Sequence, residues 1–253
     1  MMSGETEWIF GRIPVYEVLR AQKRKIKRIC IGKNIKEKGV LESILLLARK
    51  SKIPVIRVAQ SELDEVHASH QGIIASAEGY PYDSLNDILA FAETQEEEPC
   101  LLILDALKDP QNLGAILRTA EAVGVHGVIL PLRRSASITP AVVKASAGAS
   151  EHLRVARANL SQTIDLVKQR DIWIMGLENH PDAIPIENAD LKRGLALVIG
   201  SEQKGMRSLV RKSCDYLIRI PMRGKVESLN ASVAAAVALY TIWEKRGYSP
   251  SSD

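Results

Sequence analysis

The stretch LALVIGSEQKGMRSLVRKSCDYLIRIPM, residues 195–222, decides the fold class. Its first part (195–200) and its last part (216–222) are apolar runs of strand length, and the part between them (206–213) has the spacing of a helix. Strands that are apolar along most of their length are typical of parallel sheets covered on both faces. The stretch therefore predicts a strand, a helix and a second, parallel strand.

The same alternation extends over residues 100–253. Apolar strands separated by amphipathic helices predict an α/β fold built on a parallel sheet with helices on both faces. Ligands of such sheets bind beyond the carboxyl ends of the strands, so a site is expected in the loops that follow them. The other predicted strands cover 100–107, 127–131, 155–158 and 172–178, and the other predicted helices cover 112–123, 139–149, 161–170 and the residues from about 228.

Residues 1–78 are predicted to form a smaller α/β domain. Its short strands are rich in Ile and Val, and its helices place apolar residues three or four positions apart. Turn residues and an acidic run occupy 79–99, which we interpret as a linker with one short helix at 84–92. The predicted strands of the small domain are 26–32, 54–59 and 73–78, and its predicted helices are 13–21, 41–50 and 61–69.

The net charge of +4 conceals a segregation of charge along the chain. Residues 11–60 contain 14 Lys and Arg but 3 Asp and Glu, whereas residues 61–100 contain 10 Asp and Glu and no Lys or Arg. A basic first third attracts phosphates and steers a polyanion toward the protein, so nucleic acid is the predicted partner. A solvated basic face is the alternative that the charge run alone leaves open.

Composition argues against membrane, disulfide-rich and metal-dependent classes. No apolar run approaches the roughly 20 residues of a membrane span, and residues 1–10 do not resemble a signal peptide, so we expect a cytoplasmic protein. Cys30, Cys100 and Cys214 are scattered, and the five histidines form no metal-binding motif. Neither a disulfide framework nor a metal site is expected.

Three loop segments, each following a predicted strand, combine Gly, Asn, Ser and charged residues in a way that a core does not require. None of them matches the dinucleotide fingerprint, the P-loop or the hydrolase nucleophile elbow. The segments are DPQNLGAILRTAEAVG (109–124), IGSEQKGM (199–206) and IPMRGKVESLNASVAAA (220–236).

These segments resemble, in order, the three motifs of the SpoU, or TrmH-type, RNA methyltransferases of the SPOUT superfamily. The resemblance covers about 100–245. In the first domain, FGRIPVYEVLRA (10–21) and HQGIIASAE (70–78) resemble the substrate-binding domain of the subgroup that methylates a guanosine in 23S ribosomal RNA. That domain is a small α/β RNA-binding unit, in agreement with the basic first third.

The resemblance implies a function and an unusual fold. It implies S-adenosylmethionine as the methyl donor, 2′-O-methylation of a guanosine ribose in 23S ribosomal RNA as the activity, and a homodimer. It also implies that the last strands and helix thread through a loop to form a deep trefoil knot, which periodicity does not predict. Methylation of transfer RNA or of another ribosomal RNA site is one alternative, and a non-catalytic RNA-binding assembly factor is another.

The resemblance also implies the residues of the cofactor pocket. Physical arguments agree with it, because a glycine at position 200 lets backbone approach a ligand and apolar Ile220 and Leu229 are suited to enclose a purine. As an alternative, Gly200 is a turn glycine after a strand. The implied cofactor residues are Ile199, Gly200, Ile220, Met222, Ser228 and Leu229.

Arg118 is the first candidate for catalysis. It lies off the apolar stripe of its predicted helix, and a fixed cation there would stabilise negative charge developing on the ribose oxygen. A guanidinium is a poor proton acceptor, so phosphate or water is expected to take the proton. A solvated helix arginine is the alternative that the motif argues against.

Four further residues are implied to act with Arg118. Asn112 is interpreted both as the N-cap of its helix and as a ligand of the ribose or backbone. Glu202 is expected to orient the active-site loop, with an exposed loop glutamate as the alternative. Ser228 and Asn230 open the last helix, where they are expected to cap it and to position the substrate.

Overall fold

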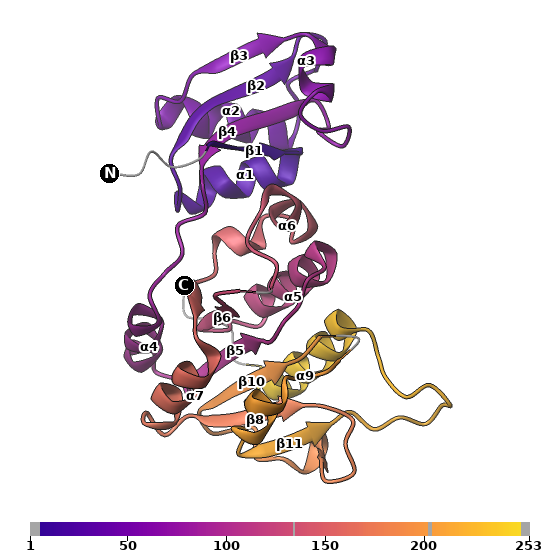
Figure 1. Cartoon of the computed structure of the whole chain (residues 1–253). Coiled ribbons are helices and arrows are strands. Elements are labelled where there is room, and N and C mark those ends of the chain that lie inside the picture. Colours follow the sequence, from indigo (N-terminus) through magenta and orange to yellow (C-terminus); the bar gives the residue numbers. More distant parts are fainter. Residues whose placement is uncertain (1–5, 134, 202–203, 249–253) are drawn as a thin grey trace. The chain divides into compact units, whose positions relative to one another are not determined.

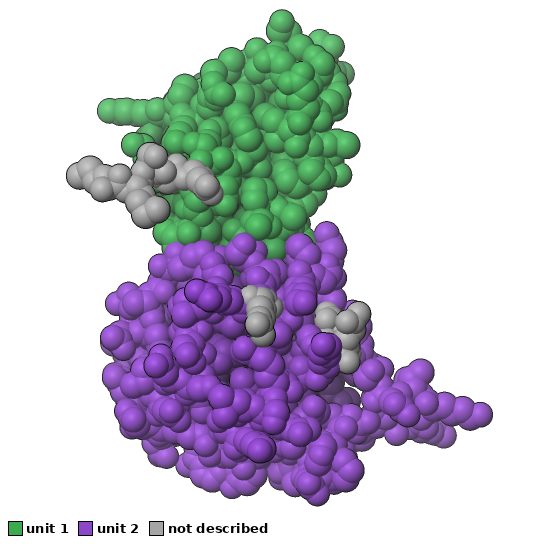
Figure 2. Space-filling model, in the orientation of Figure 1, with its two compact units in different colours: residues 1–81, 138–152 green, residues 82–137, 153–253 purple. Residues whose placement is uncertain are grey.

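The structure is a computed structural model that describes residues 6–133, 135–201 and 204–248. The chain divides into two compact units, coloured separately in Figure 2. Unit 1 comprises residues 1–81 and 138–152, and unit 2 comprises residues 82–137 and 153–253.

Unit 1 is built on a mixed four-stranded sheet in the order β1-β4-β2-β3 (Figure 1). The middle strand β2 (Ile26–Gly32) pairs in parallel with β3 (Val55–Val58) and antiparallel with β4 (Ile73–Glu78). The remaining strand, β1 (Thr6–Phe10), pairs antiparallel with β4 and was not predicted. The helices of the first 81 residues are α1 (Arg12–Ala21), α2 (Val40–Lys50) and α3 (Gln60–Asp64).

The core of unit 1 follows from the spacing of apolar residues on its helices. Helix α1 buries Val15, Val18 and Leu19, which lie three or four positions apart and so share one face. Helix α2 buries a similar face that includes Leu41 and Ile44, and the two helices pack against each other. The apolar spacing that predicted helices at 13–21 and 41–50 is therefore the spacing that gives each helix its buried face.

Residues 138–152 belong to unit 1, although the sequence suggested that they would lie within a domain at 100–253. They form α6 (Pro140–Ala145) and the 3-10 helix η1 (Ala149–Glu151). The helix predicted at 139–149 ends early because the backbone turns left-handed at Ala147 and Gly148, with φ of 52° and 86°. A left-handed residue ends an α-helix.

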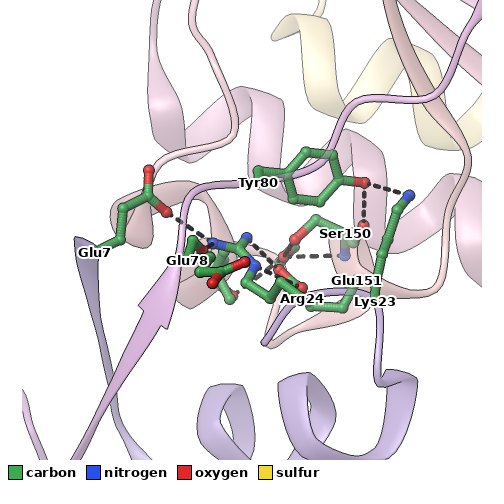
Figure 3. A network of polar contacts seen from close by, with 9 residues as sticks. Glu7, Lys23, Arg24, Glu78, Tyr80, Ser150 and Glu151 are labelled. Carbon is green, nitrogen blue, oxygen red and sulfur yellow. Dashed lines mark hydrogen bonds and ion pairs between the residues drawn. The ribbon is translucent and has the colours of Figure 1, made fainter. Parts of the chain in front are cut away.

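A buried ion pair connects residues 138–152 to the first 81 residues of unit 1 (Figure 3). Arg24 Nη2 lies 2.7 Å from Glu151 Oε1, and both side chains are fully buried. The same guanidinium donates to Glu7 Oε2 at 2.7 Å and to the carbonyl oxygen of Glu78 at 3.3 Å. A buried charge requires an opposite charge and hydrogen bonds of this kind. Tyr80 adds a hydrogen bond from its hydroxyl to the carbonyl oxygen of Ser150 at 2.9 Å.

Unit 2 is built on a seven-stranded sheet in the order β7-β6-β5-β10-β8-β11-β9. Every pairing in it is parallel, which confirms the predicted parallel α/β sheet. Figure 1 shows β5, β10, β8 and β11 side by side. In chain order the strands are β5 (Cys100–Leu104), β6 (Gly127–Pro131), β7 (Val155–Ala158), β8 (Trp173–Leu177), β9 (Ile184–Pro185), β10 (Leu195–Ile199) and β11 (Tyr216–Arg219).

Both faces of this sheet are covered. Helices α4 (Leu85–Thr94), α7 (Leu160–Lys168) and α8 (Ser208–Lys212) join one core cluster with alternate strand residues such as Leu101 and Ile103. The intervening residue Leu102 points to the other face and is also fully buried. The two other α-helices described in this unit, α5 (Pro110–Ala122) and α9 (Ala231–Lys245), pack against each other. A short 3-10 helix, η2 (Ile186–Asn188), follows β9.

Helix α4 falls within the segment that was interpreted as a linker. It buries Ile88 and Leu89, and Ile88 lies so close to Gly127 that a Cβ there would meet its Cγ2 at 2.3 Å. The helix is therefore part of the packed sheet structure of unit 2. Within the described ranges, no helix is long and apolar enough to cross a bilayer.

Candidate functional site

A pocket of about 520 Å³ lies at the carboxyl ends of the central strands of unit 2. Its lining includes Leu177 at the end of β8, Ile199 at the end of β10 and Ile220 just after β11. Ligand pockets commonly enclose about 300 to 1,000 Å³ and lie at this edge of parallel sheets. The pocket thus has the position and the size expected for a small-molecule site.

All the residues implied to bind the cofactor line this pocket. Its walls come from four segments that are distant in the sequence, at 177–179, 199–205, 220–222 and 227–234. Apolar residues and glycines form most of the lining, and the polar side chains are those of Glu178, Asn179, Ser201, Glu227 and Ser228. The implied residues that the structure brings together here are Ile199, Gly200, Ile220, Met222, Ser228 and Leu229.

Gly200 is required by the loop that it begins. A Cβ at this position would lie 2.2 Å from the carbonyl carbon of Gly205 and 2.3 Å from the nitrogen of Met206. The loop is closed by two backbone hydrogen bonds between Ser201 and Gly205, at 3.1 and 2.9 Å. Gly200 is therefore a turn glycine and also a pocket residue, because the backbone that crosses it lines the same cavity.

A buried carboxylate that the sequence analysis did not single out anchors this loop. Asp105, just after β5, is fully buried and accepts hydrogen bonds from Arg207 N at 2.8 Å and Arg207 Nε at 2.7 Å. Its own backbone N–H donates to the carbonyl oxygen of Ile199 at 2.7 Å. An aspartate directly after the apolar run CLLIL was the available signal, since such a residue stands at the ligand-binding edge of the sheet.

Glu178, just after β8, is a second residue that sequence reasoning missed. It lines the pocket, and its Oε2 atom is buried with no hydrogen-bond partner among the described residues. The nearest ion-pair contact is Arg211 Nη1 at 3.9 Å. A buried carboxylate oxygen without a partner is unfavourable unless a ligand supplies a donor. The sequence feature that could have identified Glu178 was its position as the polar last residue of the predicted strand IWIMGLE (172–178).

Two of the implied catalytic residues meet where α5 and α9 begin. Asn230 Nδ2 donates to Asn112 Oδ1 at 3.1 Å. Asn230 is the N-cap of α9, which confirms that part of the interpretation, and α9 begins at Ala231. The interpretation of Asn112 as an N-cap is wrong, because Asp109 caps α5 by accepting from the backbone of Gln111 and of Asn112. Pro110 occupies the first helical position, which suits a cap at Asp109.

The remaining implied residues are placed differently. Arg118 lies on the exposed side of α5, does not line the pocket, and makes no hydrogen bond or ion pair with any described residue. Ser228 lines the pocket two residues before the cap of α9 and does not cap it. Glu202 lies outside the described residues.

The cysteines have the character of buried thiols. Burial raises the pKa of Cys214 to about 12, and it also raises the pKa of Cys30 and of Cys100. Among the residues with described positions, no three His, Cys, Asp or Glu side chains are grouped so that they could hold a metal ion.

Comparison with known proteins assigns both parts of the sequence. The model of the SpoU rRNA Methylase family matches residues 99–240, and a model described as RNA 2′-O ribose methyltransferase substrate binding matches residues 8–83. The chain is 44% identical over 247 residues to YacO of Bacillus subtilis strain 168, a protein assigned by name to the TrmH family of tRNA/rRNA methyltransferases. That alignment covers 97% of this chain and 98% of YacO.

Further relatives agree. A Staphylococcus aureus (strain MSSA476) protein assigned to the same family is 45% identical over 240 residues, covering 94% of this chain and 96% of its own. The crystal structure of the SpoU methyltransferase AviRb from Streptomyces viridochromogenes, in complex with the cofactor AdoMet, is similar with a TM-score of 0.80 and 25% identity over 94% of this chain and 89% of AviRb. An RNA 2′-O ribose methyltransferase structure matches with a TM-score of 0.76 and 25% identity, over 96% and 90% of the two chains.

Proposed function

Because the chain belongs to the SpoU rRNA methylase family, we propose that it transfers the methyl group of S-adenosylmethionine to the ribose 2′-hydroxyl of a guanosine in 23S ribosomal RNA. Family membership makes it an RNA methyltransferase, and S-adenosylmethionine is the family's methyl donor. The guanosine and the 23S ribosomal RNA are the proposal. The observation that carries the proposed methyl transfer is the pocket of unit 2, in which the loops of the second and third motifs meet residues 177–179.

The pocket fits the proposed cofactor. S-adenosylmethionine supplies an electrophilic methyl group. Ile220 and Leu229 offer apolar surface for its purine, and Met222 extends that surface. The Oε2 atom of Glu178, which has no hydrogen-bond partner among the described residues, is an acceptor for an N–H or O–H donor. The cofactor carries such donors in its ribose diol and its ammonium group. We therefore assign Glu178 to the cofactor pocket.

Arg118 is proposed to act on the ribose. A guanidinium near the 2′-oxygen stabilises the negative charge that develops there, and it holds the neighbouring phosphate through its fork of donors. Because a guanidinium does not give up its proton at neutral pH, the hydroxyl proton is assigned to a phosphate or to water. The exposure of Arg118 supports a contact with RNA rather than with the buried cofactor.

A homodimer is part of the proposal. Helix α9 exposes Val233, Val237 and Tyr240, which are 48%, 40% and 45% accessible and follow each other at helical spacing. An apolar stripe on a helix is commonly covered by another chain in symmetric dimers. We therefore propose that α9 contributes to the dimer interface and that Arg118 meets the ribose in the assembled dimer. The trefoil knot that the resemblance implies remains part of the same proposal.

Ribosomal RNA is preferred over transfer RNA because FGRIPVYEVLRA (10–21) and HQGIIASAE (70–78) resemble the substrate-binding domain of the subgroup that methylates 23S ribosomal RNA. Two observations agree with RNA binding by this part of the chain. Residues 8–83 match the substrate-binding model, and the basic first third lies in the same part of the chain. Transfer RNA stays as the alternative because the curated relatives are named for both RNAs.

Mapping of 2′-O-methyl groups tests the proposal. Ribosomal and transfer RNA from cells with and without the protein are compared nucleotide by nucleotide. We expect one guanosine of 23S ribosomal RNA to lose its ribose methyl group when the protein is absent. Loss confined to transfer RNA would replace the proposed substrate, and an unchanged map of both RNAs would contradict the proposed function.

A further inference from the structure

Unit 1 contains a second pocket, of about 570 Å³, at the end of its sheet where β2 begins. The end of α1, the start of β2 and the connection from α2 to β3 form it. Four basic residues line it, Arg24, Lys25, Lys27 and Lys52, and its lining contains no Asp or Glu. The function described above does not use this pocket.

Three of these four cations are available to a ligand. Arg24 is fully buried and is neutralised by Glu151 and Glu7 (Figure 3). Lys25, Lys27 and Lys52 are exposed, and none of them forms an ion pair with a described residue. Lys27 donates only to a neutral hydroxyl, Thr6 Oγ1, at 2.6 Å. The pocket therefore presents three positive charges that no described residue neutralises through an ion pair.

The opposite end of the same sheet provides a comparison. Lys33, Lys36 and Lys38 lie just beyond the end of β2, which at about 3.3 Å per residue places them roughly 20 Å from Lys25. Carboxylates are interleaved with them: Glu37 pairs with Arg57, and the short helix α3 adds Glu62 and Asp64. Positive charge is thus concentrated at the pocket end and balanced at the other.

The pocket lysines are not needed to stabilise the C-termini of the neighbouring helices. Helices α1 and α2 both end at this pocket, and each helix C-terminus carries about half a negative charge. Arg20, Arg49 and Lys50 already lie in the last turns of these helices. The capping interaction therefore does not account for Lys25, Lys27 and Lys52.

The backbone at the pocket gives a further indication. Gln22 and Lys52 follow the two helices in the left-handed conformation, with φ of 51° and 55°. Glycine is the favoured residue at such helix ends because a side chain there strains the backbone. Two long polar side chains instead occupy these positions, and both line the pocket.

We propose that this pocket, with Lys25, Lys27 and Lys52, binds the phosphodiester backbone of the RNA substrate. The inference rests on the proposed function, since it assigns the surface of unit 1 that holds the RNA. Lysine side chains bind phosphates as point charges and release counterions from the RNA. Contacts of this kind fix the position of the RNA without reading its bases.

A matched pair of triple variants tests the proposal. Lys25→Ala/Lys27→Ala/Lys52→Ala removes the pocket charges, and Lys33→Ala/Lys36→Ala/Lys38→Ala removes the same charge from the opposite end. Affinity for a 23S ribosomal RNA transcript, and for transfer RNA as a second probe, is measured over a series of salt concentrations. We expect the pocket variant to bind roughly tenfold or more weakly at low salt, with the slope of log affinity against log salt reduced by about 2 to 3. The control variant is expected to stay within about twofold of wild type.

The single variant Lys52→Gly separates binding from folding. It removes a charge and relieves a left-handed backbone, so stability to urea is expected to stay equal or to rise while RNA affinity falls severalfold. Unchanged RNA affinity in Lys52→Gly and in the pocket triple variant would overturn the proposal. Equal losses of affinity in the two triple variants would also overturn it, as would a wild-type chain that binds neither RNA.

Failure of this inference is distinct from failure of the proposed function. If the wild-type protein methylates RNA and the pocket variant binds that RNA normally, the inference alone fails. If the wild-type protein binds RNA through the pocket lysines but transfers no methyl group, the proposed function fails and the inference stands.

Discussion

Asn230 Nδ2 and Asn112 Oδ1 are joined by a hydrogen bond of 3.1 Å, which links the first turn of α5 to the start of α9 across 118 residues of sequence. The same Asn230 caps α9 through its Oδ1 atom, which accepts from Ser232 N at 2.9 Å and from Val233 N at 3.4 Å. One side chain therefore orders the start of the last helix and connects it to the segment that carries Arg118.

Substitution at position 230 separates these two tasks. Asn230→Ser keeps a capping oxygen but is too short to reach Asn112, so we expect stability close to wild type and a clear loss of methyl transfer. Asn230→Ala loses both, and its free energy of unfolding is expected to fall by about 1 kcal/mol. Urea unfolding and initial methylation rates check this. Full activity of the serine variant would show that the link to Asn112 is dispensable.

Glu178 is expected to contribute directly to cofactor affinity. Loss of a hydrogen bond to a charged group costs about 1.5 to 3 kcal/mol, so Glu178→Ala should weaken S-adenosylmethionine binding by roughly 10- to 100-fold in calorimetry. Methylthioadenosine, which lacks the ammonium group, identifies the donor: an equal loss with this ligand indicates the ribose, and no loss indicates the ammonium. Glu227→Ala, at the exposed acid of the same pocket, is the matched control. Equal affinities for Glu178→Ala and wild type would remove Glu178 from the site.

Asp105 is expected to hold the loop at 200–207 in position for the cofactor. Asp105→Asn weakens both bonds to Arg207, so we expect cofactor affinity to fall severalfold and the free energy of unfolding to fall by about 1 to 3 kcal/mol. Arg207→Ala removes the side-chain bond alone and keeps the backbone N–H, so its effect on affinity should be smaller. A larger effect of Arg207→Ala would show that the arginine side chain has another role.

His126 gives the stability of the protein a specific dependence on pH. Burial lowers the pKa of His126 below the ordinary value of 6.5, and the nearby Glu97 offsets this only in part. Below about pH 6.5, His126 therefore binds a proton in the unfolded chain but not in the folded chain. The free energy of unfolding falls as the pH falls toward the pKa of His126 in the folded state. We expect this loss between pH 7.5 and 5.5 to be smaller in His126→Gln, as measured by urea unfolding. An identical pH profile for both proteins would exclude His126 as its source.

Much of unit 2 could be predicted because its determinants are local. Strands such as LALVI (195–199) are apolar throughout, and each is followed by turn residues and a helix. Parallel strands place their carboxyl ends at one edge, so the loops after β10 and β11 were expected to meet, and they do at Gly200 and Ile220.

Other features depend on contacts that no local pattern records. The inclusion of residues 138–152 in unit 1 depends on long-range contacts such as the pairing of Arg24 with Glu151, which lie 127 positions apart. Glu178 follows β8 but lies against the loop that follows β10, since a Cβ on Gly205 would meet its Oε1 atom at 2.7 Å. The capping error at Asn112 had a local cause, because Asp109 followed by Pro110 was the stronger helix start.

Arg118 is the residue on which the proposed chemistry depends most. Arg118→Ala should reduce methyl transfer by at least 100-fold while cofactor affinity stays within about twofold of wild type, because the side chain lies outside the cofactor pocket. Arg118→Lys keeps the charge but loses the planar fork, so we expect it to restore only part of the rate. Near-normal turnover of the alanine variant would contradict the assigned role.

The proposed guanosine 2′-O-methylation is tested by identifying the nucleoside that receives the methyl group. The purified full chain is incubated with S-adenosylmethionine labelled in its methyl group and with unmodified 23S ribosomal RNA, which is then digested to nucleosides and separated by chromatography. We expect label in 2′-O-methylguanosine alone, and no label when Arg118→Ala replaces the wild-type protein. Label in a base-methylated nucleoside, or no transfer to any RNA offered, would contradict the proposed methylation.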